Sequence, residues 1–260
     1  MDMPKEGAAE PDMLIKDAEN VPNKGYRFSI PLAAKEASDT IAVKMFDGQG
    51  NPIRIKGGRG DDYTKNGVEY TLMKYFTWLE SEGPEHERAI GAAAKDYCAA
   101  AQLYFGYNAD SVSVSSAVDA VSAETLSDYA ADREGSLPAG VSINGISAML
   151  ESDNTLRLYL NFKEVDPSDF SYEIDGTPAV LHKRSDGMRY LALDTGVYSN
   201  KLQETHTYSI SDSTSTYTIT ASVLTYARSC AIRDDRPDTV KNLGKALYLY
   251  NDAAVDRFGD

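Results

Sequence analysis

The chain has 260 residues, of which 42% are hydrophobic, and a formal net charge of −14. This hydrophobic content is sufficient for a packed core and argues against global disorder. The negative charge repels polyphosphates and anionic lipid surfaces, so no nucleic-acid partner is expected. No stretch reaches the roughly 18 apolar residues of a membrane span, and we expect no membrane insertion.

Residues 1–24 are polar, with Gly, Pro and many acids, and indicate a tail with at most a short extended piece at Met13–Ile15. Tyr26–Ile30 alternates as a strand does, and Thr40–Phe46 is a second β-prone run. The run ends at Asp47-Gly48, a dipeptide typical of tight turns because its φ angles can be positive. Two strands are therefore expected before the first helix.

Two amphipathic helices follow a glycine-rich loop. Val68–Leu79 carries apolar residues at helical spacing and is interrupted by Gly83-Pro84. A second helix is predicted from Glu85 to Phe105, with Gly106 as its C-terminal stop. The short break between the two helices predicts an antiparallel helical hairpin over residues 68–106.

Strands dominate residues 141–220. The clearest is Thr155–Phe162, in which aliphatic and polar residues alternate perfectly, as in a sheet with one buried face. Turn signals separate several further strands, which are predicted at Ser142–Leu150, Phe170–Ile174, Ala179–Lys183, Met188–Leu193, Thr205–Ser211 and Thr216–Thr220. Seven short strands in this length are typical of a sandwich or a strongly twisted antiparallel sheet.

A second helical hairpin is predicted over residues 222–258. Ser222–Ile232 has one apolar stripe, Arg236-Pro237 breaks the pattern, and Asp238 to Phe258 forms the last helix. A shift of 153 positions superposes this hairpin on the first one. Identical residues then fall together at Pro84/Pro237, Gly91/Gly244, Ala93/Ala246, Tyr97/Tyr250, Ala100/Ala253, Ala101/Ala254, Phe105/Phe258 and Gly106/Gly259.

These matches predict a duplicated module with an α+β fold, made of an antiparallel, sandwich-like sheet region and helical hairpins. The expected organisation is a partial first copy at 1–108, a connector at 109–140 with some helical character at Val118–Ala131, and a complete second copy at 141–260. The first copy lacks the early strands, so we interpret the chain as a piece of a longer exported protein that has lost a signal peptide.

Glycine inside a helix costs about 1 kcal/mol relative to alanine. Gly91 and Gly244 therefore predict close approach of each helix to a partner element. Tyr97 and Tyr250 supply aromatic bulk with a hydroxyl that can reach a polar partner. The repeated residues, including Phe105 and Phe258, are interpreted as packing residues rather than ligand-binding residues.

Several segments resemble a module common in large cell-surface proteins of gut Clostridia and related Firmicutes. They are Gly25–Pro31 with Ala33–Glu36 and Asp39–Ile41, Lys95–Asn108, Leu137–Gly140, and Leu150–Ser152 with Thr155–Arg157. The resemblance covers most of residues 26–260 and implies an extracellular, modular segment beside other binding or catalytic modules. It supplies no catalytic residue. Some surface proteins of such commensals bind host immunoglobulin, which makes immunoglobulin one protein partner to test.

No catalytic constellation stands out in the sequence. His86, His182 and His206 have no metal-ligand spacing, and no nucleophile elbow, phosphate-binding loop or dinucleotide fingerprint is present. Cys98 and Cys230 are too few for a disulfide framework and are interpreted as reduced core residues. We therefore expect no enzyme activity, no cofactor, no metal and no catalytic residue, although an undetected enzyme stays a third hypothesis.

Two loops resemble ligand motifs. Asp47–Asn51 looks like the start of a calcium loop, but Gly58 stands where the bidentate glutamate is needed, so a hairpin turn is favoured. Arg59-Gly60-Asp61 is an integrin-type tripeptide in a glycine-rich loop, but a strand-to-helix connection with Asp62 or Thr64 as cap is the favoured interpretation.

The 17 tyrosines suggest contact surfaces, and Tyr159 and Tyr248 are expected to be exposed. The sequence thus predicts a non-catalytic extracellular module of a bacterial surface protein that binds another protein or acts as a spacer. The alternative is a carbohydrate-binding module in which exposed tyrosines stack on sugars. The partner is expected outside the cell, and its binding residues are not identified by the sequence.

Overall fold

The structure is a computed structural model that describes residues 19–21, 25–27, 30, 32–54, 67–150, 154–193 and 196–259. The extended piece predicted at Met13–Ile15 and the tripeptide Arg59-Gly60-Asp61 lie outside the described residues. The described chain combines helices with antiparallel sheets, which confirms the α+β class.

The part of the chain up to residue 106 is called the first unit. It contains β1 (Glu19–Val21), β2 (Gly25–Arg27), the 3-10 turn η1 (Ala34–Glu36), β3 (Ile41–Val43), β4 (Met45–Phe46), β5 (Pro52–Ile53), β6 (Val68–Tyr70), α1 (Leu72–Glu82) and α2 (Glu85–Phe105). Strands β3 and β4 run out to a turn and pair with β6 and β5 respectively, both antiparallel. The strands β3 to β6 are called the ribbon.

Helix α1 begins later than predicted. Residues Val68–Tyr70 form β6 and pair with β3, and the helix starts only after Thr71. The Thr71 hydroxyl accepts a 3.0 Å hydrogen bond from the backbone N–H of Lys74, which satisfies one of the free donors of the first turn. The helical spacing at Val68 was thus a misleading signal, because pairing with a distant strand prevailed over it.

Helix α2 has the predicted bounds, Glu85–Phe105. Pro84 precedes it and Gly106 ends it at a φ of 62°, a left-handed conformation that glycine adopts readily. The segment after it contains α3 (Ser116–Ala120) and η2 (Ser127–Tyr129), and it is partly buried, since Val118 and Leu126 are fully enclosed.

The part of the chain from residue 132 onward is called the second unit. Its strands are β7 (Asp132–Gly135), β8 (Val141–Leu150), β9 (Asn154–Phe162), β10 (Ser171–Ile174), β11 (Thr177–Pro178), β12 (His182–Lys183), β13 (Arg189–Ala192), β14 (His206–Ser211) and β15 (Thr216–Ala221), with η3 (Pro167–Asp169) and η4 (Ser199–Lys201) between them. Each of the seven strands predicted within residues 141–220 has a counterpart, although only His182–Lys183 of the predicted Ala179–Lys183 is a strand. Strand β7 lies inside the predicted connector, yet it pairs with β15 and so contributes to the second unit.

The strands of the second unit form two antiparallel sheets. Their orders are β11-β10-β14-β15-β7 and β12-β13-β9-β8. Leu156, Leu158 and Leu160 of β9 are buried, as their alternation predicted, and belong to the same hydrophobic cluster as Ile210 and Ile219 of the other sheet. The apolar faces of both sheets therefore contribute to one core.

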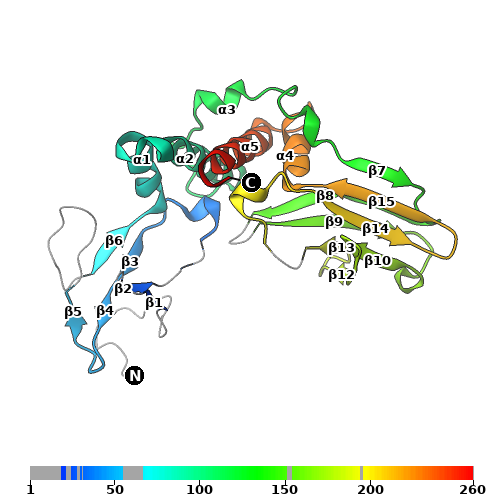
Figure 1. The fold of residues 1–260 in the computed structure, drawn as a ribbon, viewed down its shortest axis with the longest axis horizontal. Helices are drawn as coiled ribbons and strands as arrows, with labels where there is room; N and C mark the ends of the chain where they lie inside the picture. Colours follow the sequence, from blue (N-terminus) through cyan, green and yellow to red (C-terminus); the bar gives the residue numbers. More distant parts are fainter. Residues whose placement is uncertain are drawn as a thin grey trace.

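The second helical hairpin consists of α4 (Val223–Ala231) and α5 (Asp238–Phe258). It packs against the first hairpin, mainly through α2 and α5. Tyr97 and Tyr250 stack at this junction with ring centroids 5.4 Å apart and planes 11° from parallel. In Figure 1 the helices lie in the middle, the sheets of the second unit extend to one side, and the ribbon extends to the other.

The two helix-interior glycines are sites of close approach, as predicted. A Cβ at Gly91 would lie 2.9 Å from the backbone nitrogen of Glu80 and 2.9 Å from Cβ of Leu79. A Cβ at Gly244 would lie 2.3 Å from the carbonyl oxygen of Ala227 and 3.0 Å from Cβ of Cys230. In both hairpins the second helix therefore approaches the first at its glycine.

The packing role predicted for Phe105 and Phe258 was wrong. Their side chains are 50% and 61% exposed, since each lies at the last position of its helix, beyond the hairpin contact. Lys35 covers one face of the Phe105 ring, with its amine 5.2 Å from the ring centre. Core packing therefore does not explain why phenylalanine occurs at both Phe105 and Phe258.

Candidate functional site

The ribbon and the β14–β15 pair have the same local construction. Ile41 pairs with Tyr70 in the ribbon, and His206 pairs with Ala221 at the corresponding end of β14–β15. Both pairs of strands follow a 3-10 turn and lead directly into the first helix of a hairpin. The cap of that helix is Thr71 in one case and Ser222 in the other.

Hydrogen bonds repeat the correspondence. The N–H of Met73 donates to the carbonyl of Ala37 at 2.8 Å, and the N–H of Leu224 donates to the carbonyl of Leu202 at 3.1 Å. Each bond fastens the start of the helix to the residue that follows the 3-10 turn. Position by position, Met45 then corresponds to Ile210, and Met73 corresponds to Leu224.

The tips of both β-hairpins are also alike. The carboxylate of Asp47 accepts the N–H groups of Gln49 and Asn51 at 2.9 and 2.8 Å. That of Asp212 accepts the N–H groups of Thr214 and Ser215, both at 2.7 Å. In each case these backbone hydrogen bonds hold the pKa of the carboxyl below its usual value of 3.8. The Asp47–Asn51 loop is therefore a hairpin turn, as favoured from the sequence.

The corresponding surfaces differ in what covers them. Met45 is 40% exposed where Ile210 is fully buried, and Tyr70 is 41% exposed where Ala221 is 1% exposed. Ile53 pairs with Met45 and is likewise exposed. We call this surface the inner face; on the ribbon it consists of Val43, Met45, Ile53, Val68 and Tyr70, which strand pairing places on one side. Met73 and Phe76 of α1 are assigned to it because they correspond to Leu224 and Ala227, which belong to the core cluster of the second unit.

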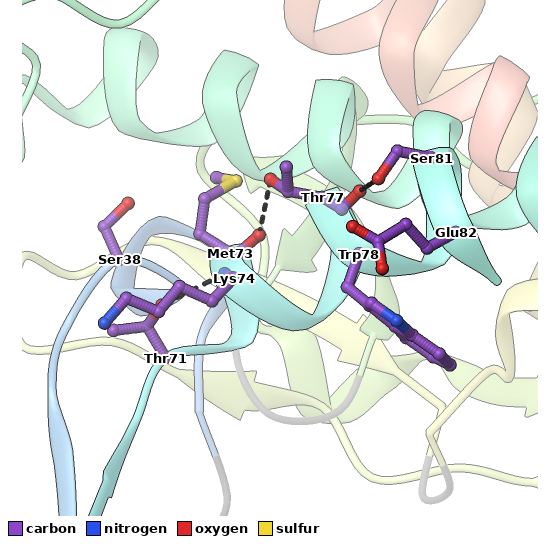
Figure 2. Close-up of a pocket in the computed structure, with 8 residues that line it drawn as sticks. All are labelled: Ser38, Thr71, Met73, Lys74, Thr77, Trp78, Ser81 and Glu82. Carbon is purple, nitrogen blue, oxygen red and sulfur yellow. Dashed lines mark hydrogen bonds between the residues drawn. The ribbon is translucent and has the colours of Figure 1, made fainter. Parts of the chain in front are cut away.

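An open groove of about 480 Å³ adjoins the inner face along α1. Figure 2 shows its lining side chains following one side of the helix, with Ser38 and Thr71 at the N-terminal end. The lining residues are Ser38, Thr71, Met73, Lys74, Thr77, Trp78, Ser81 and Glu82. Trp78 is the single tryptophan of the chain.

The groove has the chemistry of a contact surface. The hydroxyls of Thr77 and Ser81 donate to helix carbonyls at 2.9 and 2.8 Å, as the dashed lines in Figure 2 show. Lys74 and Met73 lie toward one end of the groove, and Trp78 and Glu82 lie together toward the other. An open surface that mixes large apolar side chains with charged ones is typical of protein contacts.

The three histidines lie on three different elements and have different partners. His86 is on the exposed first turn of α2, beside Glu87. His182 stacks on Tyr190 at 5.2 Å between ring centres. The Nδ1 atom of His206 lies 2.8 Å from a carboxylate oxygen of Asp175. Partial burial tends to raise the pKa of Asp175, but the hydrogen bonds from His206 and from the N–H of Thr207 lower it overall.

The cysteines are free and buried, which confirms their assignment as reduced core residues. Burial raises the pKa of the Cys98 thiol to about 12. Because the thiolate is the nucleophilic form, such a thiol is unreactive at neutral pH. Burial also raises the pKa of Cys230, so neither cysteine is an activated nucleophile.

The exposure predicted for Tyr159 was wrong. Only 7% of its surface is accessible, because Tyr190 on the neighbouring strand packs beside it at 5.6 Å between ring centres. Tyr248 is half-buried and contacts Tyr129 at 6.1 Å. The tyrosines named as candidate contacts are therefore occupied by cross-strand and helix packing.

Two features are absent from the described residues. These residues contain no group of three or more His, Cys, Asp and Glu side chains placed to hold a metal ion. Within the same ranges, no helix combines the length and the apolar character needed to cross a membrane.

The chain was also compared with protein-family models, with curated proteins and with solved structures, and none of them matches it. The candidate site therefore rests on the geometry of this molecule. Sequence reasoning missed the inner face. Its only signal was the run of large apolar residues Met45, Phe46 and Ile53 around a polar turn, which a strand pattern alone does not identify as exposed.

Proposed function

We propose that this chain is a non-catalytic protein-binding module of a bacterial surface protein and that it binds its partner through the inner face. The observation that carries the proposal is the contrast between Met45, 40% exposed, and Ile210, fully buried at the corresponding position. Large apolar side chains that cluster on one exposed face are typical of protein contact sites.

The composition of the face supports a protein partner rather than a sugar. Met45, Ile53 and Met73 are aliphatic or thioether side chains, which pack on other apolar side chains. The carbohydrate-binding alternative named Tyr159 and Tyr248 as exposed stacking residues, whereas Tyr159 is buried and Tyr248 is half-buried against Tyr129. A spacer, in turn, gains nothing from a face of this kind, since exposed apolar surface promotes unspecific association.

The test uses the whole chain immobilised beside two variants. Met45→Asp places a charge on the inner face, whereas Val180→Asp places one on a 71% exposed apolar residue of the second unit. Host immunoglobulin is the first probe and a glycan array is the second. Retention of immunoglobulin by the chain and by Val180→Asp, with loss in Met45→Asp, supports the proposal.

Two other results would count against it. Equal binding by the two variants would place the contact elsewhere, and selective binding of glycans without any protein ligand would favour the carbohydrate alternative. Circular dichroism of both variants checks that the added charge leaves the fold intact, as expected for surface positions.

A further inference from the structure

In the second unit, the surface that corresponds to the inner face is covered by a second sheet. Ile210 and Ile219 are fully buried in one cluster with Leu156 and Leu158 of β9. The hydroxyl of Tyr208 donates a 3.0 Å hydrogen bond to the carbonyl of Leu156, which fixes the two sheets against each other. Helix α4 also contacts β8 and β9. The side of β14 and β15 that corresponds to the inner face is thus covered by an antiparallel sheet, which contributes aliphatic side chains to the contact.

The outer edges of the same strands are occupied as well. Strand β10 pairs with β14, and β7 pairs with β15. In the first unit, β3 and β6 form a two-stranded sheet within the described residues. An isolated pair of strands is marginally stable in water, and open strand edges readily accept another extended chain. The described part of the first unit contains no counterpart of β7, β8, β9 or β10.

The charges of the ribbon allow a strand of another polypeptide to approach it closely. Its described residues carry two cations, Lys44 and Arg54, and two anions, Asp47 and Glu69. It is locally balanced within a chain of net charge −14. A polar or acidic strand that approaches this part of the molecule therefore meets less repulsion than elsewhere on the surface.

We infer that the inner face binds a β-rich segment of another polypeptide. Strands of that segment pair with the outer edges of β3 and β6, as β10 and β7 pair with β14 and β15. Two further strands of it pack face to face on Met45 and Met73 with an aliphatic side of the kind that Leu156, Leu158 and Leu160 form. The inference rests on the proposed function and specifies its partner. The recognised segment alternates aliphatic and polar residues, so that main-chain bonds give affinity and side chains give selectivity.

The experiment adds a probe to the full chain. The probe is a separately produced segment with the sequence of residues 132–178, which spans β7 to β11 and contains no tryptophan. Binding is expected to shift the emission of Trp78 to shorter wavelength. It is also expected to slow amide exchange in β3 and β6 by about tenfold or more, because the open edges acquire hydrogen bonds.

Matched variants connect the response to the inner face. Met45→Asp should abolish both the shift of Trp78 emission and the slower amide exchange, and Val180→Asp should retain them. A probe that carries Leu156→Lys and Leu158→Lys should cause neither change. Unchanged exchange in β3 and β6 at saturating probe overturns the inference, and so does a response confined to β14 and β15. If immunoglobulin binds but amide exchange in the ribbon is unchanged, the proposed function is retained and the inference of strand addition is rejected.

Discussion

Met45 and Ile210 stand at corresponding positions of two β-hairpins, yet one is 40% exposed and the other is fully buried. The strands around them share register, turn chemistry and the hydrogen bond to the following helix. The local construction therefore does not determine exposure. In the second unit a facing sheet covers the hairpin, and in the described part of the first unit no strand has that position.

The largest expected effect comes from deleting the same volume at these two positions. Ile210→Ala should lower the free energy of unfolding by about 2–5 kcal/mol, because it leaves a cavity in the shared core. Met45→Ala should change it by about 0.5 kcal/mol or less, because the side chain is already in contact with water. Urea denaturation measures both. Equal losses would show that the ribbon is covered in solution.

The next effect concerns the glycines inside the helices. Gly244→Ala and Gly91→Ala should each destabilise the chain by about 1–3 kcal/mol through overpacking, although alanine favours a helix. Gly244→Ala should cost more, since its Cβ would lie 2.3 Å from a carbonyl oxygen, against 2.9 Å for the nearest atom at Gly91. Thermal unfolding of the two variants shows which substitution lowers the stability more. A stabilised variant would contradict the close approach.

A smaller effect is expected where the two hairpins meet. Tyr97 and Tyr250 stack at 5.4 Å, and a double-mutant cycle with Leu at each position should give a coupling of about 0.5–1.5 kcal/mol. The cycle Tyr97/Tyr159 is the control, because Tyr159 packs on a different partner in the sheet. A coupling near zero for the stacked pair would mean that the hairpins are not held together by these rings.

The smallest effect is the pH dependence of the two turns. Asp47 and Asp212 have pKa values below 3.8 in the folded chain, because each carboxylate accepts backbone N–H groups. Their stabilisation is complete above the unfolded pKa and is lost as the pH falls through the lower folded pKa. NMR titration of both carboxyls should therefore give midpoints below 3.8. A normal midpoint at Asp47 alone would distinguish the ribbon from β14–β15.

The helices illustrate what local sequence signals determine. The bounds of α2 and α5 were predicted correctly, because a proline before each helix and a glycine after it stop the helix wherever the chain is placed. The start of α1 was predicted wrongly, because Val68–Tyr70 has helical spacing but pairs with β3. Strand pairing depends on residues far away in the sequence, which a local pattern does not contain.

The candidate site could not be predicted for a related reason. Exposure of Met45 or burial of Tyr159 depends on what lies opposite, and alternation along a strand shows only that two faces exist. The same holds for Phe105 and Phe258, whose apolar character suggested a core that ends one turn before them. The duplication stays a prediction, and the similar glycines, caps and turns of the two units do not identify which surface is free.

The contact between α2 and α5 has a consequence for how the chain tolerates being cut. Each helix has 21 residues and is about 30 Å long, so the two units meet along a long seam rather than through a linker. A nick by a protease in the exposed stretch Ser122–Thr125 would leave two fragments that remain bound to each other. The two pieces, made separately, should then reassemble as a heterodimer, with the helix pair as its interface.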